Sequence, residues 1–335
     1  MKPMNYTTRT AFLSCVHFLV DFSCALILFS RFYGEGNWAI SLLVYNFCAF
    51  ALQLPMGILA DYFGKANRFS ALGCVLVAAG FVLPSLMSTA IVIGIGNGLF
   101  HVGGGVEVMR GAPRKATPLG IFVAPGAIGL YLGTILGKRT AMFSVPVALV
   151  LVACALVCLL LASKQEEQTE ENAPWSILIL AAMFLVVVLR SMSGLFMAFS
   201  WKTGVFALLA VVCTAGGKAC GGIVSDRWGI RLSAAVSLLL SAVLFLLGEY
   251  ALAGLCAIFL FNMTMPMTLY SLCTRYRASC GAMFGLLTLA LFVGFLPQYL
   301  GLHLPGEGGL WLCVLALVSL LILVPAAGRR QRVGK

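Results

Sequence analysis

Long apolar runs separated by short polar turns occupy almost the whole chain of 335 residues. A run of about 20 apolar residues is long enough to cross the hydrocarbon core of a bilayer as a helix. Because backbone polar groups find no water partner in lipid, we expect each such run to be helical. The pattern predicts an all-α integral membrane protein with twelve transmembrane helices, at 10–31, 38–60, 69–87, 89–109, 119–137, 141–162, 175–200, 204–224, 232–248, 250–272, 281–303 and 309–327.

Composition supports this class. The chain is 61% hydrophobic and 10% charged, with a mean hydropathy of +1.03. Soluble domains are about 45–50% apolar and about 25% charged, so this chain has too few charges to cover a surface in water. The net charge of +11 comes from short clusters between apolar runs. A nucleic-acid-binding protein would carry a continuous basic patch on a soluble fold, so we expect no nucleic-acid partner.

The positive charges also predict an orientation. With both termini in the cytoplasm, 16 of the 22 Lys and Arg fall in cytoplasmic segments and four in outer segments. Such a bias is typical of membrane proteins and favours an even number of spans. The first apolar run is too long for a cleavable signal peptide and contains Asp21. Together with the short loops, this predicts a multi-pass protein of the cell inner (plasma) membrane.

A polar stretch at 163–174 separates two sets of six predicted spans. It has the composition of a flexible linker, here cytoplasmic, between an N-terminal six-helix bundle at 1–162 and a C-terminal one at 175–335. Duplicated halves are one way of building a transporter, with the substrate site between them. One chain supplies both halves, so we expect a monomer whose partners are the lipid bilayer and a small solute.

A local pattern recurs in the two halves. Gly57, Asp61 and Gly64 follow the second span, and Asp226 with Gly222 and Gly229 follows the eighth at an offset of 165 residues (226 − 61). The first copy, with Leu59, Ala60 and Lys65, resembles the G-x-L-A-D-x-x-G-[RK] signature of the major facilitator superfamily. The resemblance implies the major facilitator fold, with two six-helix pseudo-repeat bundles and transport by alternating access.

The resemblance also implies a cytoplasmic latch, in which an aspartate at a helix end pairs with basic residues or with the N-terminus of a helix in the other bundle. An ordinary charged loop is the alternative. The latch residues are Gly57, Asp61, Gly64, Lys65, Arg68, Asp226, Arg227 and Gly229.

A narrower resemblance lies in spans 1 and 4. His17 and Asp21 in the pattern H-F-x-x-D, and Asn97 and His101 in the pattern G-N-G-L-F-H, resemble the fosmidomycin-resistance type of this superfamily, whose members export drugs and small anions. The glycines at 103–105 depart from the His-Pro usual there. The resemblance implies that spans 1, 4, 7 and 10 line a central cavity, where His101 would face Asp21. A faint similarity of 124–129 to an element of proton-driven antiporters favours export.

Ionisable side chains inside spans are expensive and usually mark a transport pathway. Asp21 lies midway along span 1, with His17 one turn away on the same face. A carboxylate in a poorly solvated site can exchange protons near neutral pH, and imidazoles can pass them on. We therefore predict proton coupling at His17, Asp21 and His101. Structural hydrogen bonds to neighbouring helices are the alternative for each.

Two cations lie within predicted spans of the second half. Arg190 is too deep in span 7 to reach an interface easily, so it needs an anionic partner. We expect Asp21 to be that partner in the empty protein and a substrate anion to replace it. Lys218 in span 8 either contacts substrate or extends toward the cytoplasm. The candidate substrate contacts are Arg190, Lys218, Asn97, Asn262 and Tyr270.

Glu107 and Arg110 end span 4 at i and i+3, where they form either a cytoplasmic gate pair or a solvated surface pair. The 12 cysteines show no CxxC spacing, and no nucleophile–His–acid set is visible. We therefore expect no metal, no cofactor and no enzymatic activity.

These observations predict a secondary active transporter that moves a small organic anion by alternating access coupled to protons. We expect protonation of Asp21 to free Arg190 for substrate. Proton and anion would then compete for one charge network, the simplest basis for export by antiport. Proton-coupled multidrug efflux and anion uptake by symport are the alternatives.

Overall fold

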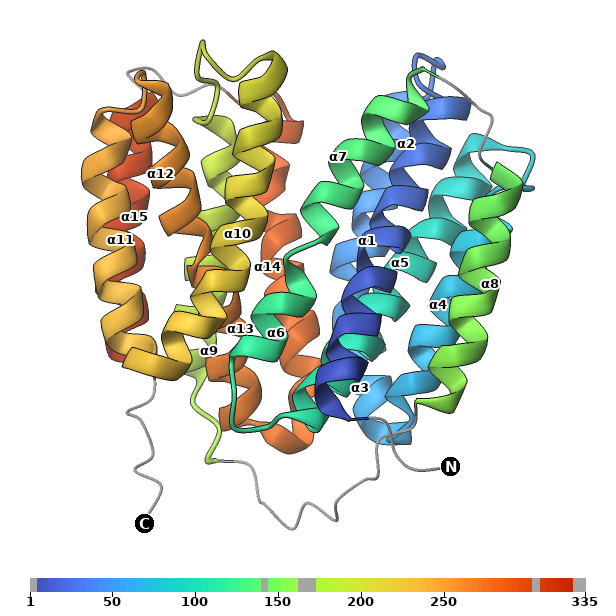
Figure 1. Cartoon of the computed structure of the whole chain (residues 1–335), viewed down its shortest axis with the longest axis horizontal. Coiled ribbons are helices and arrows are strands. Elements are labelled where there is room, and N and C mark those ends of the chain that lie inside the picture. The colour runs from blue at the N-terminus through green and yellow to red at the C-terminus, as the bar shows by residue number, and fades with distance from the viewer. Residues whose placement is uncertain (1–4, 140–143, 162–172, 303–307, 328–335) are drawn as a thin grey trace.

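The computed structural model describes residues 5–139, 144–161, 173–302 and 308–327, and these residues form helices without strands. Two groups of helices stand side by side, α1 to α8 in one and α9 to α15 in the other (Figure 1). The elements are α1 (Tyr6–Arg31), α2 (Trp38–Asn46), the π-helix η1 (Phe47–Ala51), α3 (Gln53–Phe63), α4 (Ala66–Ala79), α5 (Leu86–Gly111), α6 (Thr117–Val123), α7 (Gly126–Gly137), α8 (Ser144–Leu160), α9 (Ile177–Met192), the 3₁₀ turn η2 (Ser193–Leu195), α10 (Gly204–Trp228), α11 (Ile230–Leu246), α12 (Ala251–Asn262), α13 (Thr264–Arg275), the 3₁₀ turn η3 (Arg277–Ser279), α14 (Cys280–Tyr299) and α15 (Gly308–Ala326).

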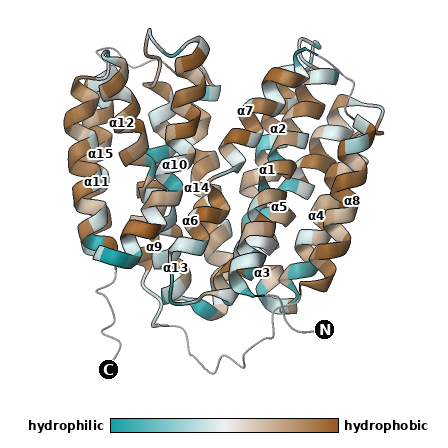
Figure 2. Cartoon of the chain, in the orientation of Figure 1, coloured by the Kyte–Doolittle hydropathy of each residue, from teal (hydrophilic) through white to brown (hydrophobic). Residues whose placement is uncertain are grey.

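Nine helical segments in the described part of the chain are long and apolar enough to cross a membrane, and three shorter apolar helices, α4, α8 and α11, accompany them. Each segment overlaps one of the twelve predicted spans, so the all-helical membrane fold is confirmed, while the count of twelve crossings stays a prediction. Figure 2 shows hydrophobic residues along the helices and hydrophilic ones mainly at their ends. Large apolar side chains such as Leu156, Leu178 and Leu252 are exposed on the outside of the bundles, as lipid contact requires.

The largest boundary error concerns the third predicted span. The sequence suggested 69–87, whereas α4 ends at Ala79 and α5 begins at Leu86. Gly80 closes α4, and the Pro84 ring favours an extended residue before it, so the helix cannot run through this segment. Of the predicted linker at 163–174 only residues 173 and 174 are described, and both chain termini also lie outside the described residues.

Glycines set the spacing between α1 and α7. Gly129 and Gly133, on one face of α7, lie directly against the backbone carbonyls of Phe18 and Phe22 on α1, and a Cβ at either position would collide with them. Small residues four apart let two membrane helices approach closely. This contact fixes α1, and therefore the face that carries His17 and Asp21, against the first bundle.

Candidate functional site

The structure brings His17 and Asp21 on α1 together with Asn97 and His101 on α5. The Nε2 atoms of His17 and His101 are 2.7 Å apart. The carboxylate of Asp21 lies beside both rings, with Oδ2 3.2 Å from His17 Nε2 and Oδ1 3.7 Å from His101 Nε2. We refer to His17, Asp21 and His101 as the histidine–aspartate cluster. Residues of α1 and α5 that are 76 or more apart in sequence thus form one polar site inside an apolar bundle.

Hydrogen bonds to backbone carbonyls fix which ring nitrogens carry hydrogen. His17 Nδ1 lies 2.6 Å from Phe122 O, and His101 Nδ1 lies 2.8 Å from Asn97 O. A carbonyl oxygen only accepts, so each Nδ1 must donate an N–H. In two neutral rings both Nε2 atoms would then present bare lone pairs to each other. Two lone pairs at this distance repel each other, so the arrangement suits a shared proton or another cation between the rings, next to the negative charge of Asp21.

Asn97 fixes the carboxylate. Its Nδ2 donates to Asp21 Oδ1 at 2.8 Å, and its side chain is buried. The sequence suggested Asn97 as a substrate contact, which stays a prediction, and in the structure its amide contacts Asp21. The amide therefore orients the carboxylate toward the two imidazoles.

Arg190 and Lys218 lie in the second bundle, on α9 and α10. Arg190 is 9% exposed, and its guanidinium makes no hydrogen bond or ion pair with any described residue. The expected pairing with Asp21 is not made, because that carboxylate bonds to the first-bundle cluster. Lys218 lies within electrostatic range of both Arg190 and Asp21. Lys218 is half-buried and is thus within electrostatic range of both Arg190 and the histidine–aspartate cluster.

The remaining predicted substrate contacts lie in two different places. Asn262 donates to Ile258 O in its own helix, and its Cβ faces Gly217, the neighbour of Lys218. Tyr270 lies within electrostatic range of Asp226. Tyr270 thus lies toward the end of the bundle where the repeated motif lies, and its role as a substrate contact stays a prediction.

The two repeated aspartates join the bundles. Asp61, near the end of α3, accepts from the backbone N–H groups of Gly281 at 2.9 Å and Ala282 at 2.8 Å. These are the first residues of α14, and a carboxylate at a helix N-terminus complements the helix dipole. Asp61 thus contacts the N-terminal turn of a helix in the other bundle, which is one of the two kinds of partner that the resemblance implies.

Asp226, near the end of α10, makes the matching contact in the opposite direction. It accepts from the backbone of Ala116 at 2.7 Å and of Thr117 at 3.0 Å, and from the Thr117 hydroxyl. Gly281 follows Ala116 by the same 165 residues that separate the two aspartates. Each half therefore caps a helix of the other half by the same bond pattern, at one end of the molecule. The sequence identified the two acceptors, Asp61 and Asp226. The donors are backbone N–H groups, which cannot be recognised from the type of residue that carries them.

Glycines permit these two contacts. Gly57 faces the carbonyl of Gly281, and Gly285 faces the carbonyl of Gln53, so a Cβ at either site would collide with backbone. The symmetry-related Gly120 lies against Lys218 O. Gly64 and Gly229 end their helices with positive φ angles of 66° and 83°, which other residues rarely adopt.

The charged residues around the motif differ in their surroundings. Lys65, Arg68 and Arg227 are exposed. Arg110 Nη1 donates to Gly64 O at 3.2 Å and so holds the loop after α3. Glu107 is buried and lies 3.4 Å from Arg9 Nη1, which rules out the solvated surface pair and adds Arg9, a residue that the sequence did not single out.

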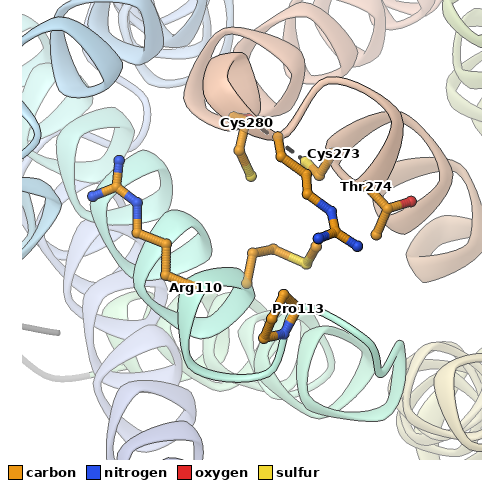
Figure 3. A pocket seen from close by; sticks show the side chains of 7 residues that line it. Arg110, Pro113, Cys273, Thr274 and Cys280 are labelled. Atoms are coloured by element: carbon orange, nitrogen blue, oxygen red, sulfur yellow. Dashed lines mark hydrogen bonds between the residues drawn. The ribbon is translucent and has the colours of Figure 1, made fainter. Parts of the chain in front are cut away.

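A small pocket lies beside the contact between α3 and α14. Arg110 and Pro113 line it from the first bundle, and Cys273, Thr274 and Cys280 from the second (Figure 3). Its volume of about 20 Å³ holds about one water molecule, so it is not a substrate site.

Comparison with known proteins finds similar structures but no similar sequences. No family model matches the chain, and no curated protein matches it in sequence. Solved structures match over nearly the whole chain. The Escherichia coli fucose:proton symporter FucP has a TM-score of 0.70 at 15% identity, covering 97% of this chain and 100% of its own. The human organic anion transporter MFSD10 (TETRAN) has a TM-score of 0.68 at 18% identity, covering 94% and 98%. A second FucP structure, described as a major facilitator superfamily transporter in the outward conformation, has a TM-score of 0.67 at 15% identity. The chain therefore has the fold of the major facilitator superfamily transporters.

Proposed function

We propose that this protein is a secondary active transporter that carries a small organic anion by alternating access, coupled to protons. The observation that carries the proposal is the buried guanidinium of Arg190, which forms no ion pair with any carboxylate in the described part of the chain. The fold supports it, since the solved structures that share this fold are described as a proton symporter and an organic anion transporter.

A buried charge without a partner is strongly unfavourable, by several kcal/mol for each ion. Lys218 adds a second positive charge within range of Arg190. No carboxylate in the described part of the chain pairs with either cation. An anionic substrate supplies the missing charge, which is why we propose carboxylates, phosphonates or inorganic oxyanions as the substrate class.

We propose the histidine–aspartate cluster as the proton site. A proton held between the two Nε2 atoms would lie beside Asp21, and Lys218 from the second bundle is the cation within electrostatic range. The other ionisable groups within electrostatic range of the carboxylate are the Cys24 thiol and the Tyr45 phenol. The two halves thus divide the work, with protons held in the first and the anion held in the second.

The charges favour cotransport over the antiport that the sequence suggested. Antiport requires proton and substrate to compete for one group, and Arg190, the proposed anion site, does not pair with Asp21. A proton added to the cluster instead makes the surroundings of Lys218 and Arg190 more positive, which strengthens anion binding. Proton and anion then travel in the same direction.

We propose that the two aspartate contacts form the cytoplasmic latch of alternating access. We also propose that the chain crosses the inner membrane twelve times, with both termini in the cytoplasm. Both contacts lie at the end of the bundles where the sequence places the cytoplasmic loops, so the latch closes the pathway on that side. Opening requires both pairs of bonds to break and the glycine faces to separate. A monomer suffices, because one chain contains both halves.

The first experiment is a thermal-shift screen of the detergent-purified protein against small anions and cationic drugs, at acidic and neutral pH. An anion should raise the Tm, more strongly at acidic pH. The stabilisation should vanish in Arg190→Gln and persist in Arg139→Gln, which removes an exposed arginine. Stabilisation by cationic drugs that Arg190→Gln leaves unchanged would contradict the proposal and favour multidrug efflux.

A further inference from the structure

We propose that His17, Asp21 and His101 also bind a divalent transition-metal ion. The sequence predicted no metal site, because the two histidines are 84 residues apart and no ligand spacing is visible. The fold brings one donor atom from each of the three residues within 4.8 Å of the others.

The donor distances suit a metal of this size. Ligands of a tetrahedral zinc ion lie about 2.0–2.2 Å from it and therefore about 3.3 Å from one another. The two Nε2 atoms are 2.7 Å apart, and each has one oxygen of Asp21 close by, Oδ2 at 3.2 Å from His17 and Oδ1 at 3.7 Å from His101. The two imidazoles would have to separate by about half an ångström to admit an ion. Two imidazoles and one carboxylate favour Zn²⁺, Co²⁺ or Ni²⁺ over Mg²⁺ and Ca²⁺, which prefer oxygen ligands.

Each residue that would bind the metal is already oriented by a hydrogen bond to a neighbouring group outside the cluster. Phe122 O and Asn97 O accept from the two Nδ1 atoms, so both Nε2 lone pairs must point into the cluster. The Asn97 amide holds one oxygen of Asp21 at 2.8 Å. Metal-ligating histidines almost always donate their second nitrogen to a carbonyl or carboxylate in this way, and ligating carboxylates are themselves hydrogen-bonded. A polar cluster that served packing alone would not need both lone pairs aimed at one point.

Space and charge set the conditions for binding. Gly126 on α7 lies beside the donors, and a Cβ there would collide with Asp21 Oδ2 and His17 Nε2. The Asp21 side chain keeps 18% of its exposure, so the site is not sealed. Lys218 opposes a cation within its electrostatic range. We therefore expect binding to strengthen when an anion neutralises Lys218 and Arg190.

The test uses Co²⁺, because tetrahedral cobalt absorbs visible light and a thiolate ligand adds a separate near-ultraviolet band that would reveal binding to any of the 12 cysteines. The protein is purified without a histidine tag. We expect one Co²⁺ per chain without the thiolate band. Binding should weaken at least tenfold in His101→Gln and in Asp21→Asn. It should persist in His303→Gln, which removes the third histidine of the chain.

Anion-induced thermal shifts, measured on the same samples, report whether each variant is folded. Failure to bind Co²⁺ in wild-type protein that still responds to anions would overturn the metal site and leave the proposed transport function standing. Equal binding by wild type and His101→Gln would place the ion elsewhere and overturn the inference as well. Co²⁺ binding with no anion response would instead retain the metal site and count against the anion carrier.

Discussion

The latch predicts how a substitution at Asp61 changes the fraction of molecules that are open at this end. Replacing Asp61 with Asn keeps the shape of the side chain but removes its charge and leaves one oxygen to accept hydrogen bonds. In the structure two backbone N–H groups at the start of α14 donate to this carboxylate, at 2.8 and 2.9 Å. The substitution should therefore destabilise the arrangement in which this end of the molecule is closed, without altering the interior of either bundle.

The magnitude follows from these two bonds. A hydrogen bond to a charged group contributes about 1.5–3 kcal/mol, and the variant loses one such bond; this figure already includes the attraction of the charge to the helix N-terminus. Since 1.4 kcal/mol is a factor of ten, the population open at this end should rise about 10–150-fold. Asp226→Asn should act similarly, because its carboxylate accepts from the start of α6. The two contacts are separate, so their effects on the free energy should add in the double variant.

Cys280 reports opening without an engineered label. It directly precedes Gly281, a donor to Asp61, and its side chain is 5% exposed (Figure 3). Its rate of alkylation, followed by mass spectrometry of the corresponding peptide, should rise in each variant by the factor given above. Cys24 is buried in the first bundle and should react equally slowly in all samples. Unchanged alkylation of Cys280 in the double variant would refute the latch, and faster reaction of Cys24 would show unfolding instead.

Three further substitutions probe other parts of the account. Arg190→Met removes the unpaired buried charge, so it should raise the free energy of unfolding by about 1–4 kcal/mol, seen as a higher Tm, while abolishing anion binding. Gly285→Leu places a side chain against the Gln53 carbonyl, so it should speed alkylation of Cys280 and stop transport in vesicles. Asn97→Ala frees the Asp21 carboxylate while keeping both imidazoles. It should therefore shift the pH dependence of transport without abolishing anion-induced stabilisation, and an unchanged pH profile would contradict the role given to Asn97.

The apolar pattern predicted the helices well because lipid imposes one rule on every crossing segment. It failed at 69–87, where hydropathy continues through Gly80 and Pro84 but the helix does not. Repeat spacing identified Asp61 and Asp226, yet it could not reveal Gly281 or Ala116, whose backbone donates. Side-chain identity carries no information about such donors.

The sequence identified which residues belong to the interior site better than it identified which of them contact one another. Asp21, His17, His101 and Arg190 stood out because ionisable groups are rare in apolar spans. Their partners depend on how helices rotate about their axes, which one sequence does not specify. The sequence thus suggested an ion pair between Asp21 and Arg190. In the structure the Asp21 carboxylate lies against two imidazoles, and Arg190 has no ion-pair partner among the described residues.

The central claim is tested most directly by flux in proteoliposomes. An anion identified by thermal shift is offered outside vesicles whose lumen is alkaline relative to the medium, with the membrane potential clamped. The account predicts uphill accumulation of the anion that collapses with a protonophore and is lost in Arg190→Gln but not in Arg139→Gln. Accumulation that is unaffected by the pH gradient, or that survives Arg190→Gln, would contradict it.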